Sequence, residues 1–198
     1  VKTAAAAHGT ARIDGIAWTL IVCYGVYGFG YIIPATFLPA LGRQLFPDPL
    51  VFGWAWPAFG AAAALSTIFA ASWLKGMPPR RLVALGTLLT AAGVAAPALA
   101  PGLATILVSA LCVGGSFVVV TMAAFRDARL IAGANASRVV AAMTAAFALG
   151  QLIGPLTVPS GSIETSLPIP SLVASVGLLA AAIVLLRSPA RPLVPIAD

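Results

Sequence analysis

The stretch GIAWTLIVCYGVYGFGYIIPATFLPAL, residues Gly15–Leu41, contains no Asp, Glu, Lys, Arg or His. An uncharged apolar segment of this length can cross the hydrocarbon core of a bilayer, which needs about 20 residues at a rise of 1.5 Å per residue. In lipid its backbone polar groups must bond to one another, and it is too long and too uniformly apolar for a strand of a barrel. We therefore predict a transmembrane helix.

Five further apolar stretches follow, separated by short loops. They lie at Gly53–Leu74, Leu82–Ala100, Leu103–Phe125, Arg138–Pro159 and Leu167–Leu186. The composition is 61% hydrophobic and 8% charged, whereas soluble domains carry about 25% charged residues. These features exclude a water-soluble fold and predict an all-α integral membrane protein with six transmembrane helices over residues 15–187. The loop Arg126–Arg138 mixes charges with apolar residues, and we expect a short helix there at the interface.

Basic residues are unequally shared between the two sides of the predicted membrane domain. Of the eleven lysines and arginines, only Arg43 falls on the side opposite the termini. The positive-inside rule therefore predicts that both termini are cytoplasmic. We expect residues 1–14 to be a cytoplasmic linker between domains of a longer protein, and residues 188–198 a cytoplasmic tail. Because the basic residues cluster beside helix ends and form no continuous face, we expect no nucleic-acid partner.

The turn at Pro101-Gly102 divides the six predicted helices into two groups of three. Because three crossings are an odd number, the second group starts from the opposite side of the membrane. This layout predicts an inverted 3+3 repeat.

Polar side chains within the predicted helices are the candidates for contact with a solute. Tyr24, Tyr27 and Tyr31 recur at spacings of three and four, so they share one face of a helix. Their rings either stack on a substrate or make contacts within the protein. Within lipid the side-chain amide of Gln151 needs a hydrogen-bond partner. That partner is either the substrate or a neighbouring helix, and the sequence favours neither. The candidate substrate-cavity residues are Tyr24, Tyr27, Tyr31, Thr36, Ser116 and Gln151.

Glycines and prolines within two of the predicted helices mark candidate points of bending. A proline removes one backbone hydrogen bond of a helix, and nearby glycines weaken the helix further. The alternative is that the glycines only let two helix backbones approach closely. The candidate bend or gating residues are Gly28, Gly30 and Pro34 in the first helix and Gly150, Gly154 and Pro155 in the fifth.

Charged groups are missing from the middle of the predicted helices, where proton or ion relays usually lie. Nor do these helices contain a nucleophile, a base or a cluster of metal ligands. We therefore expect a protein that is not an enzyme and has no cofactor or metal site. The neighbouring charges Arg126 and Asp127 predict a local pair at a membrane edge.

The runs Gly28–Pro39 and Phe52–Pro57 together resemble the C-terminal half of YbfB/YjiJ-type transporters of the major facilitator superfamily. The resemblance extends from about Gly15 to Arg187. It implies secondary active transport of a small solute by alternating access, in a bacterial cytoplasmic membrane. It also implies that these helices are the seventh to twelfth of twelve, and that an N-terminal six-helix half is the partner. The first and fourth helices would then line the cavity.

One competing hypothesis remains from the sequence. A six-helix membrane protein could instead be a non-transporting scaffold or assembly partner. Against this, a scaffold has no reason to align three tyrosines beside a weakened helix.

Overall fold

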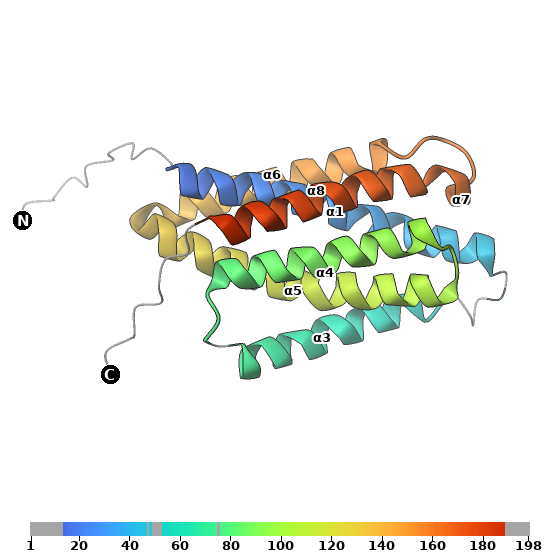
Figure 1. Ribbon diagram of the computed structural model, residues 1–198, viewed down its shortest axis with the longest axis horizontal. Helices are drawn as coiled ribbons and strands as arrows, with labels where there is room; N and C mark the ends of the chain where they lie inside the picture. Colours follow the sequence, from blue (N-terminus) through green and yellow to red (C-terminus); the bar gives the residue numbers. More distant parts are fainter. Residues whose placement is uncertain (1–13, 47, 49–52, 75, 189–198) are drawn as a thin grey trace, which may run out of the picture.

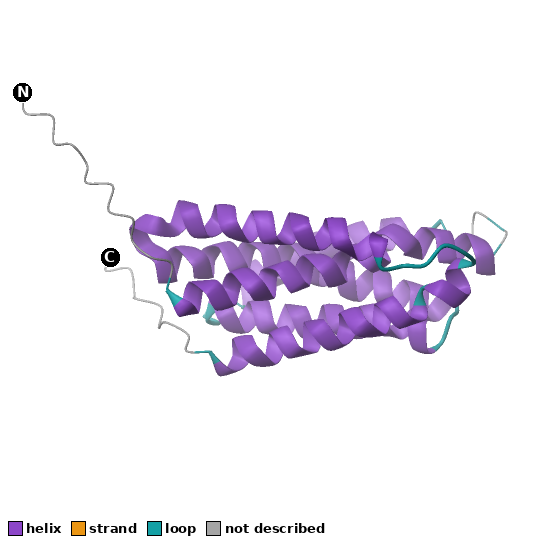
Figure 2. Cartoon of the chain, turned by 90° about the horizontal axis from the view of Figure 1, so that it is seen from above, coloured by secondary structure: helices purple, strands orange, loops and turns teal. Residues whose placement is uncertain are grey.

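The computed structural model describes residues 14–46, 48, 53–74 and 76–188. In these residues all regular structure is helical (Figures 1 and 2), which confirms the predicted all-α class. The predicted linker, except for Asp14, and the predicted tail beyond Ser188 lie outside the described residues.

Six long helices make up most of the described chain, and each overlaps one of the predicted apolar stretches. They are α1 (Gly15–Leu45), α3 (Ala55–Trp73), α4 (Pro79–Leu99), α5 (Leu103–Ala132), α6 (Ala136–Leu156) and α8 (Pro168–Arg187). A short 3-10 turn, η1 (Gly133–Asn135), joins α5 to α6, and the single-turn helix α7 (Ile163–Ser166) precedes α8.

Four stretches of the described chain are long and apolar enough to cross a membrane. They are Gly15–Leu45, Pro79–Leu99, Leu103–Leu156 and Ile163–Arg187. The third stretch contains both α5 and α6, because η1 connects them without a gap in helical structure. Helix α3 is not among the four stretches. These stretches are what an integral membrane protein requires.

The predicted interfacial helix between Arg126 and Arg138 is wrong, because α5 continues without a break to Ala132. Ala124, Ala128 and Ile131 recur at spacings of four and three and are all buried. The buried face of α5 therefore extends beyond the predicted end of the span, and the helix continues with it. Gly133, at a φ of 51°, ends the helix in the left-handed region that favours glycine.

The long helices lie side by side along one axis, with their connections at the two ends of the bundle (Figures 1 and 2). Among them, α4 packs between α5 and α8, and α1 packs between α6 and α8. By contrast, α3 packs mainly against α5, and none of its described residues is buried. The core is therefore built chiefly from α1, α4, α5 and α8.

Charge differs strongly between the two ends of the bundle. The end where α1 begins and α8 ends (Figure 1) carries two described aspartates, Asp14 and Asp127, and six described arginines, which are Arg80, Arg81, Arg126, Arg129, Arg138 and Arg187. The opposite end carries one described arginine, Arg43, together with Asp48 and Glu164. One end is thus strongly basic.

Glycines set the distance between helices at two crossings. Where α1 meets α6, a Cβ atom on Gly28 would lie 2.9 Å from Cα of Phe147, and one on Gly150 would lie 2.6 Å from the backbone nitrogen of Phe29. Where α5 meets α3, a Cβ on Gly114 would lie 2.9 Å from Cα of Phe59. The helix backbones are therefore in direct contact at both crossings, as small residues allow in membranes.

The candidate bend residues lie within continuous helices. The helix α1 runs without interruption across Gly28, Gly30 and Pro34, and α6 includes Pro155 in its last turn. In this conformation neither helix is broken, and Gly28 and Gly150 serve close packing.

Replacing Gly150 by valine should destabilise the bundle, because the new side chain meets the backbone of α1 with no room to move. Overpacking of this kind costs about 1–3 kcal/mol. Thermal unfolding of the detergent-solubilised protein, followed by circular dichroism, measures the effect.

The matched control is Gly60→Ala on α3, where a Cβ would meet nothing within 4 Å. Because alanine suits a helix better than glycine does, this variant should be neutral or stabilised by up to about 1 kcal/mol. An equal loss of stability in both variants would contradict the packing role of Gly150.

Candidate functional site

The three tyrosines of α1 form a stacked ladder. The ring centroids of Tyr24 and Tyr27 are 6.0 Å apart, with planes 17° from parallel, and those of Tyr27 and Tyr31 are 6.3 Å apart at 23°. The predicted shared face is therefore present. We call Tyr24, Tyr27 and Tyr31 the tyrosine ladder.

Phenylalanines from three other helices surround the ladder. The ring of Phe147 on α6 lies 5.1–6.3 Å from all three tyrosine rings. Phe117 on α5 stacks on Tyr31 at 4.5 Å, and Phe59 on α3 lies 6.5 Å from the same ring. The sequence analysis missed these partners. One sequence signal is the position of Phe117, three residues after Gly114. The other two partners, Phe147 and Phe59, lie on helices that pack against glycines of α1 and α5.

The ladder passes from the bundle interior toward the surface. Tyr24 and Tyr27 are buried, at 3% and 1% exposure, whereas Tyr31 is only partly buried. The hydroxyl of Tyr24 donates to Oγ1 of Thr121 at 3.3 Å. Tyr31 is therefore the member of the ladder most accessible to a solute in this conformation.

The other three candidate cavity residues occupy different environments. Ser116 is buried, and its hydroxyl lies 2.6 Å from that of Thr90 on α4. Gln151 is partly exposed and lies four residues after Phe147, hence on the same face of α6. Thr36 is exposed, and five residues after Tyr31 it points about 140° away around the helix. Gln151 thus shares a helix face with Phe147, which contacts the ladder, whereas Thr36 lies on a different face of α1 from Tyr31.

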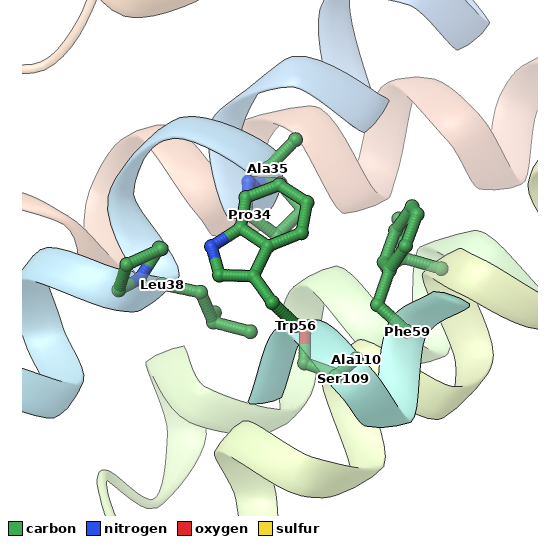
Figure 3. Close-up of a pocket in the computed structure, with 9 residues that line it drawn as sticks. Pro34, Ala35, Leu38, Trp56, Phe59, Ser109 and Ala110 are labelled. Carbon is green, nitrogen blue, oxygen red and sulfur yellow. The ribbon is translucent and has the colours of Figure 1, made fainter. Parts of the chain in front are cut away.

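A small cavity lies between α1, α3 and α5 (Figure 3). Its volume is about 20 Å³, which is room for about one water molecule. The Trp56 indole extends from α3 toward Pro34 and Leu38. The full lining is Pro34, Ala35, Leu38, Pro39, Trp56, Phe59, Ser109, Ala110 and Val113.

Two polar groups distinguish this cavity from the apolar wall around it. Ser109 is fully buried, and its hydroxyl has no hydrogen-bond partner within the described part of the chain. The carbonyl of Ala35 has no N–H to accept from four residues later, because that residue is Pro39. A buried hydroxyl without a partner is costly, so Ser109 favours a water molecule or a polar group of a ligand.

A buried ion pair joins α4 to α5 at the basic end of the bundle. Nε of Arg80 donates to Oδ2 of Asp127 at 2.8 Å, and the side chains are 1% and 3% exposed. The predicted local pair of Arg126 and Asp127 is therefore wrong. Asp127 falls on the buried face of α5, while Arg126 is exposed, so the aspartate faces the first turn of α4. Neighbouring helix residues point in directions about 100° apart.

A comparison with protein families matches residues 2–186 to the family described as "Uncharacterised MFS-type transporter YbfB". The chain belongs to this family. No curated protein and no solved structure matches it. Membership confirms the resemblance to YbfB-type transporters of the major facilitator superfamily. It places the chain among transporters of the major facilitator superfamily, which act on small molecules in a lipid environment and are not a class of enzymes.

Within this YbfB-type transporter, Asp127→Asn should unfold at a markedly lower temperature. Removing one charge of a buried pair takes away the opposite charge that stabilises the other, at a cost of about 3–5 kcal/mol. Thermal unfolding in detergent measures the loss.

The control is Arg81→Gln, which removes the exposed neighbouring charge and should change stability by less than about 0.5 kcal/mol. The double variant Arg80→Met/Asp127→Leu should be more stable than Asp127→Asn, because apolar side chains can replace a buried ion pair. A double variant less stable than Asp127→Asn would mean that the fold depends on the charges themselves.

Proposed function

We propose that this chain is the C-terminal six-helix half of a transporter that moves a small neutral, aromatic or amphipathic solute by alternating access. The observation that carries the proposal is the tyrosine ladder, which leads from the buried interior to the partly exposed Tyr31 and carries no ionisable carboxylate or amine. Aromatic faces hold apolar rings, and hydroxyls supply the hydrogen bonds that orient them.

The helix packing supports an inverted 3+3 repeat. In such a repeat the first three long helices correspond in order to the last three, so α1 corresponds to α5, α3 to α6 and α4 to α8. Under this correspondence the α1–α6 contact is equivalent to the α5–α3 contact. The same correspondence relates the α1–α8 contact to the α5–α4 contact, and it maps the α4–α8 contact onto itself. A pseudo-two-fold axis in the membrane plane relates the triplets of such repeats.

The two glycine crossings correspond to each other in the same way. Gly28 on α1 faces Phe147 on α6 as Gly114 on α5 faces Phe59 on α3, with equal distances of 2.9 Å to the phenylalanine Cα. Three residues after each glycine stand Tyr31 and Phe117, and these two rings stack on each other. The stacked pair would then lie close to the proposed axis, where two triplets of a repeat meet.

We also propose that α3 crosses the membrane, which makes six spans. Its 19 residues extend about 28 Å at 1.5 Å per residue, close to the thickness of the hydrocarbon core. Its described residues are uncharged and none is buried, so its surface faces lipid or another protein segment. An N-terminal six-helix half is the partner that the two-half architecture requires.

The glycine crossings are where the proposed motion would take place. Gly28, Gly150 and Gly154 let α1 and α6 touch without interlocking side chains, and Gly30, Pro34 and Pro155 reduce the local stiffness of the helices. Small changes in the α1–α6 angle would alter access to Tyr31 and Gln151. In this proposal Tyr24, Tyr27 and Ser116 support the site from within, and Thr36 lies at its margin.

Replacing Tyr31 or Gln151 by alanine should lower transport about tenfold, because each change removes a contact at the solute site. The measurement is uptake of salicin, a neutral aromatic glycoside, into membrane vesicles that contain the full-length protein carrying this chain. Lactose, a neutral sugar without an aromatic ring, serves as the comparison solute.

The matched control is Thr144→Val, an exposed position on α6 whose hydroxyl bonds only to its own helix at Val140. It should leave uptake unchanged. Equal uptake in all variants would refute the site, and absence of salicin uptake by the unaltered protein would refute the solute class. Failure of every solute would favour the scaffold hypothesis.

We further propose that the basic end of the bundle faces the cytoplasm of a bacterium, as the positive-inside rule requires. Ala134 and Ser160 lie at opposite ends of α6, and both are exposed. In a background of Cys23→Ala and Cys112→Ala, a membrane-impermeant maleimide should label Ser160→Cys in intact cells and Ala134→Cys only after lysis. The reverse pattern would invert the topology.

A further inference from the structure

A long groove runs between α1 and α8, outside the site already described. Its volume is about 540 Å³. The residues along it are mostly small or apolar, with Gly15, Trp18, Thr19, Val22, Cys23 and Val26 on α1 and Gly177, Ala180, Ala181 and Val184 on α8.

The groove has the length of one lipid leaflet. It extends from Gly15 to Val26 along α1, which is about 16 Å at 1.5 Å per residue. Half of a hydrocarbon core of about 30 Å is nearly the same distance. It starts at the basic end of the bundle and ends near the middle of the helices, so it coincides with a single leaflet.

The groove walls offer an apolar surface even where polar residues occur. The hydroxyl of Thr19 donates to the carbonyl of Gly15, and the thiol of Cys23 lies 3.7 Å from the carbonyl of Ala181 as a weak donor. Trp18 and Val22 are 53% and 58% exposed. A hydrocarbon chain therefore matches this surface, and a polar ligand does not.

The pair α4–α5, which the proposed repeat relates to α1–α8, is packed more closely. There a Cβ on Gly93 would lie 2.7 Å from Cβ of Cys112, whereas a Cβ on Gly177 would meet only Val26, at 3.4 Å. The groove is thus a local departure from the packing of the equivalent pair. Its floor at Gly177 has room for additional atoms.

The charge at the mouth of the groove identifies the kind of lipid. Arg187 ends α8 there and is exposed. The one acidic residue at the start of α1, Asp14, uses Oδ1 to accept a hydrogen bond from the Ala17 amide at 2.8 Å, as an N-cap. The whole end of the bundle is rich in arginine, and an anionic headgroup is attracted to such a surface.

We propose that the groove between α1 and α8 binds one acyl chain of an anionic phospholipid, with the headgroup beside Arg187. The lipid fills the space over Gly177 and separates the first and last helices of the bundle from the rest of the bilayer. This site is distinct from the solute site, because it lies between α1 and α8, whereas the solute site lies where α1 crosses α6.

Fluorescence of Trp18 tests the proposal directly, because Trp18 lines the groove and the other tryptophans do not. The full-length protein, with every tryptophan except Trp18 replaced by phenylalanine, is reconstituted in vesicles with brominated lipids. Brominated phosphatidylglycerol should quench Trp18 with a relative affinity about fivefold above that of brominated phosphatidylcholine, the preference expected from one arginine near the headgroup.

The matched reporter is Trp73, which is 79% exposed on α3 and lies outside the groove. With Trp73 as the only tryptophan, the two lipids should quench with a ratio closer to one. Gly177→Leu, or Ala180→Leu if the first variant does not fold, should fill the groove and remove the preference at Trp18. Arg187→Gln should reduce it.

Three results would overturn the proposal. Equal quenching of Trp18 by both lipids would mean ordinary annular contact. Absence of quenching by either lipid would mean that another protein segment covers the groove. A preference that survives both groove-filling variants would place the anionic lipid elsewhere.

Discussion

Direct contact between helix backbones is the constraint on which the rest of this structure depends. In a bilayer the lipid chains are as apolar as the side chains, so burial of apolar area gives little reason for helices to associate. Van der Waals contact between closely packed helices holds them together instead, and close approach requires positions without side chains. Gly28, Gly150 and Gly114 provide these positions at the α1–α6 and α3–α5 crossings. The positions of α1 and α5 relative to their neighbours follow from them.

The aromatic cluster is a consequence of these crossings. Because Gly28 admits the backbone of Phe147, the ring of Phe147 reaches Tyr24, Tyr27 and Tyr31 together. A larger residue at Gly28 would move α6 outward and carry Phe147 away from the ladder. The solute site we propose therefore depends on helix contact as much as on the tyrosines themselves, and a change in the crossing would change both access and shape.

The sequence predicted the features that depend on local pattern. The length of each apolar stretch predicted a long helix, and the spacing of Tyr24, Tyr27 and Tyr31 predicted that the three rings share one face. It could not predict which residues meet across helices. Asp127 was expected to pair with Arg126, its neighbour in sequence, but helical geometry turns Asp127 toward Arg80 on α4. The continuation of α5 to Ala132 was missed because charged residues from Arg126 onward interrupt the apolar run, although Ala128 and Ile131 continue the buried face.

The distribution of charge follows from the cost of burying an ion in lipid. The one buried ion pair in the described residues, Arg80 with Asp127, lies near the basic end, where the helices leave the apolar region. Between the ends, the polar groups of the described residues include hydroxyls, an amide and backbone carbonyls, as at Ser109, Gln151 and Ala35. Such groups orient a neutral solute through hydrogen bonds, but they do not offset the desolvation of a fixed charge. The same cost that keeps arginine at the helix ends therefore favours an uncharged solute in the middle.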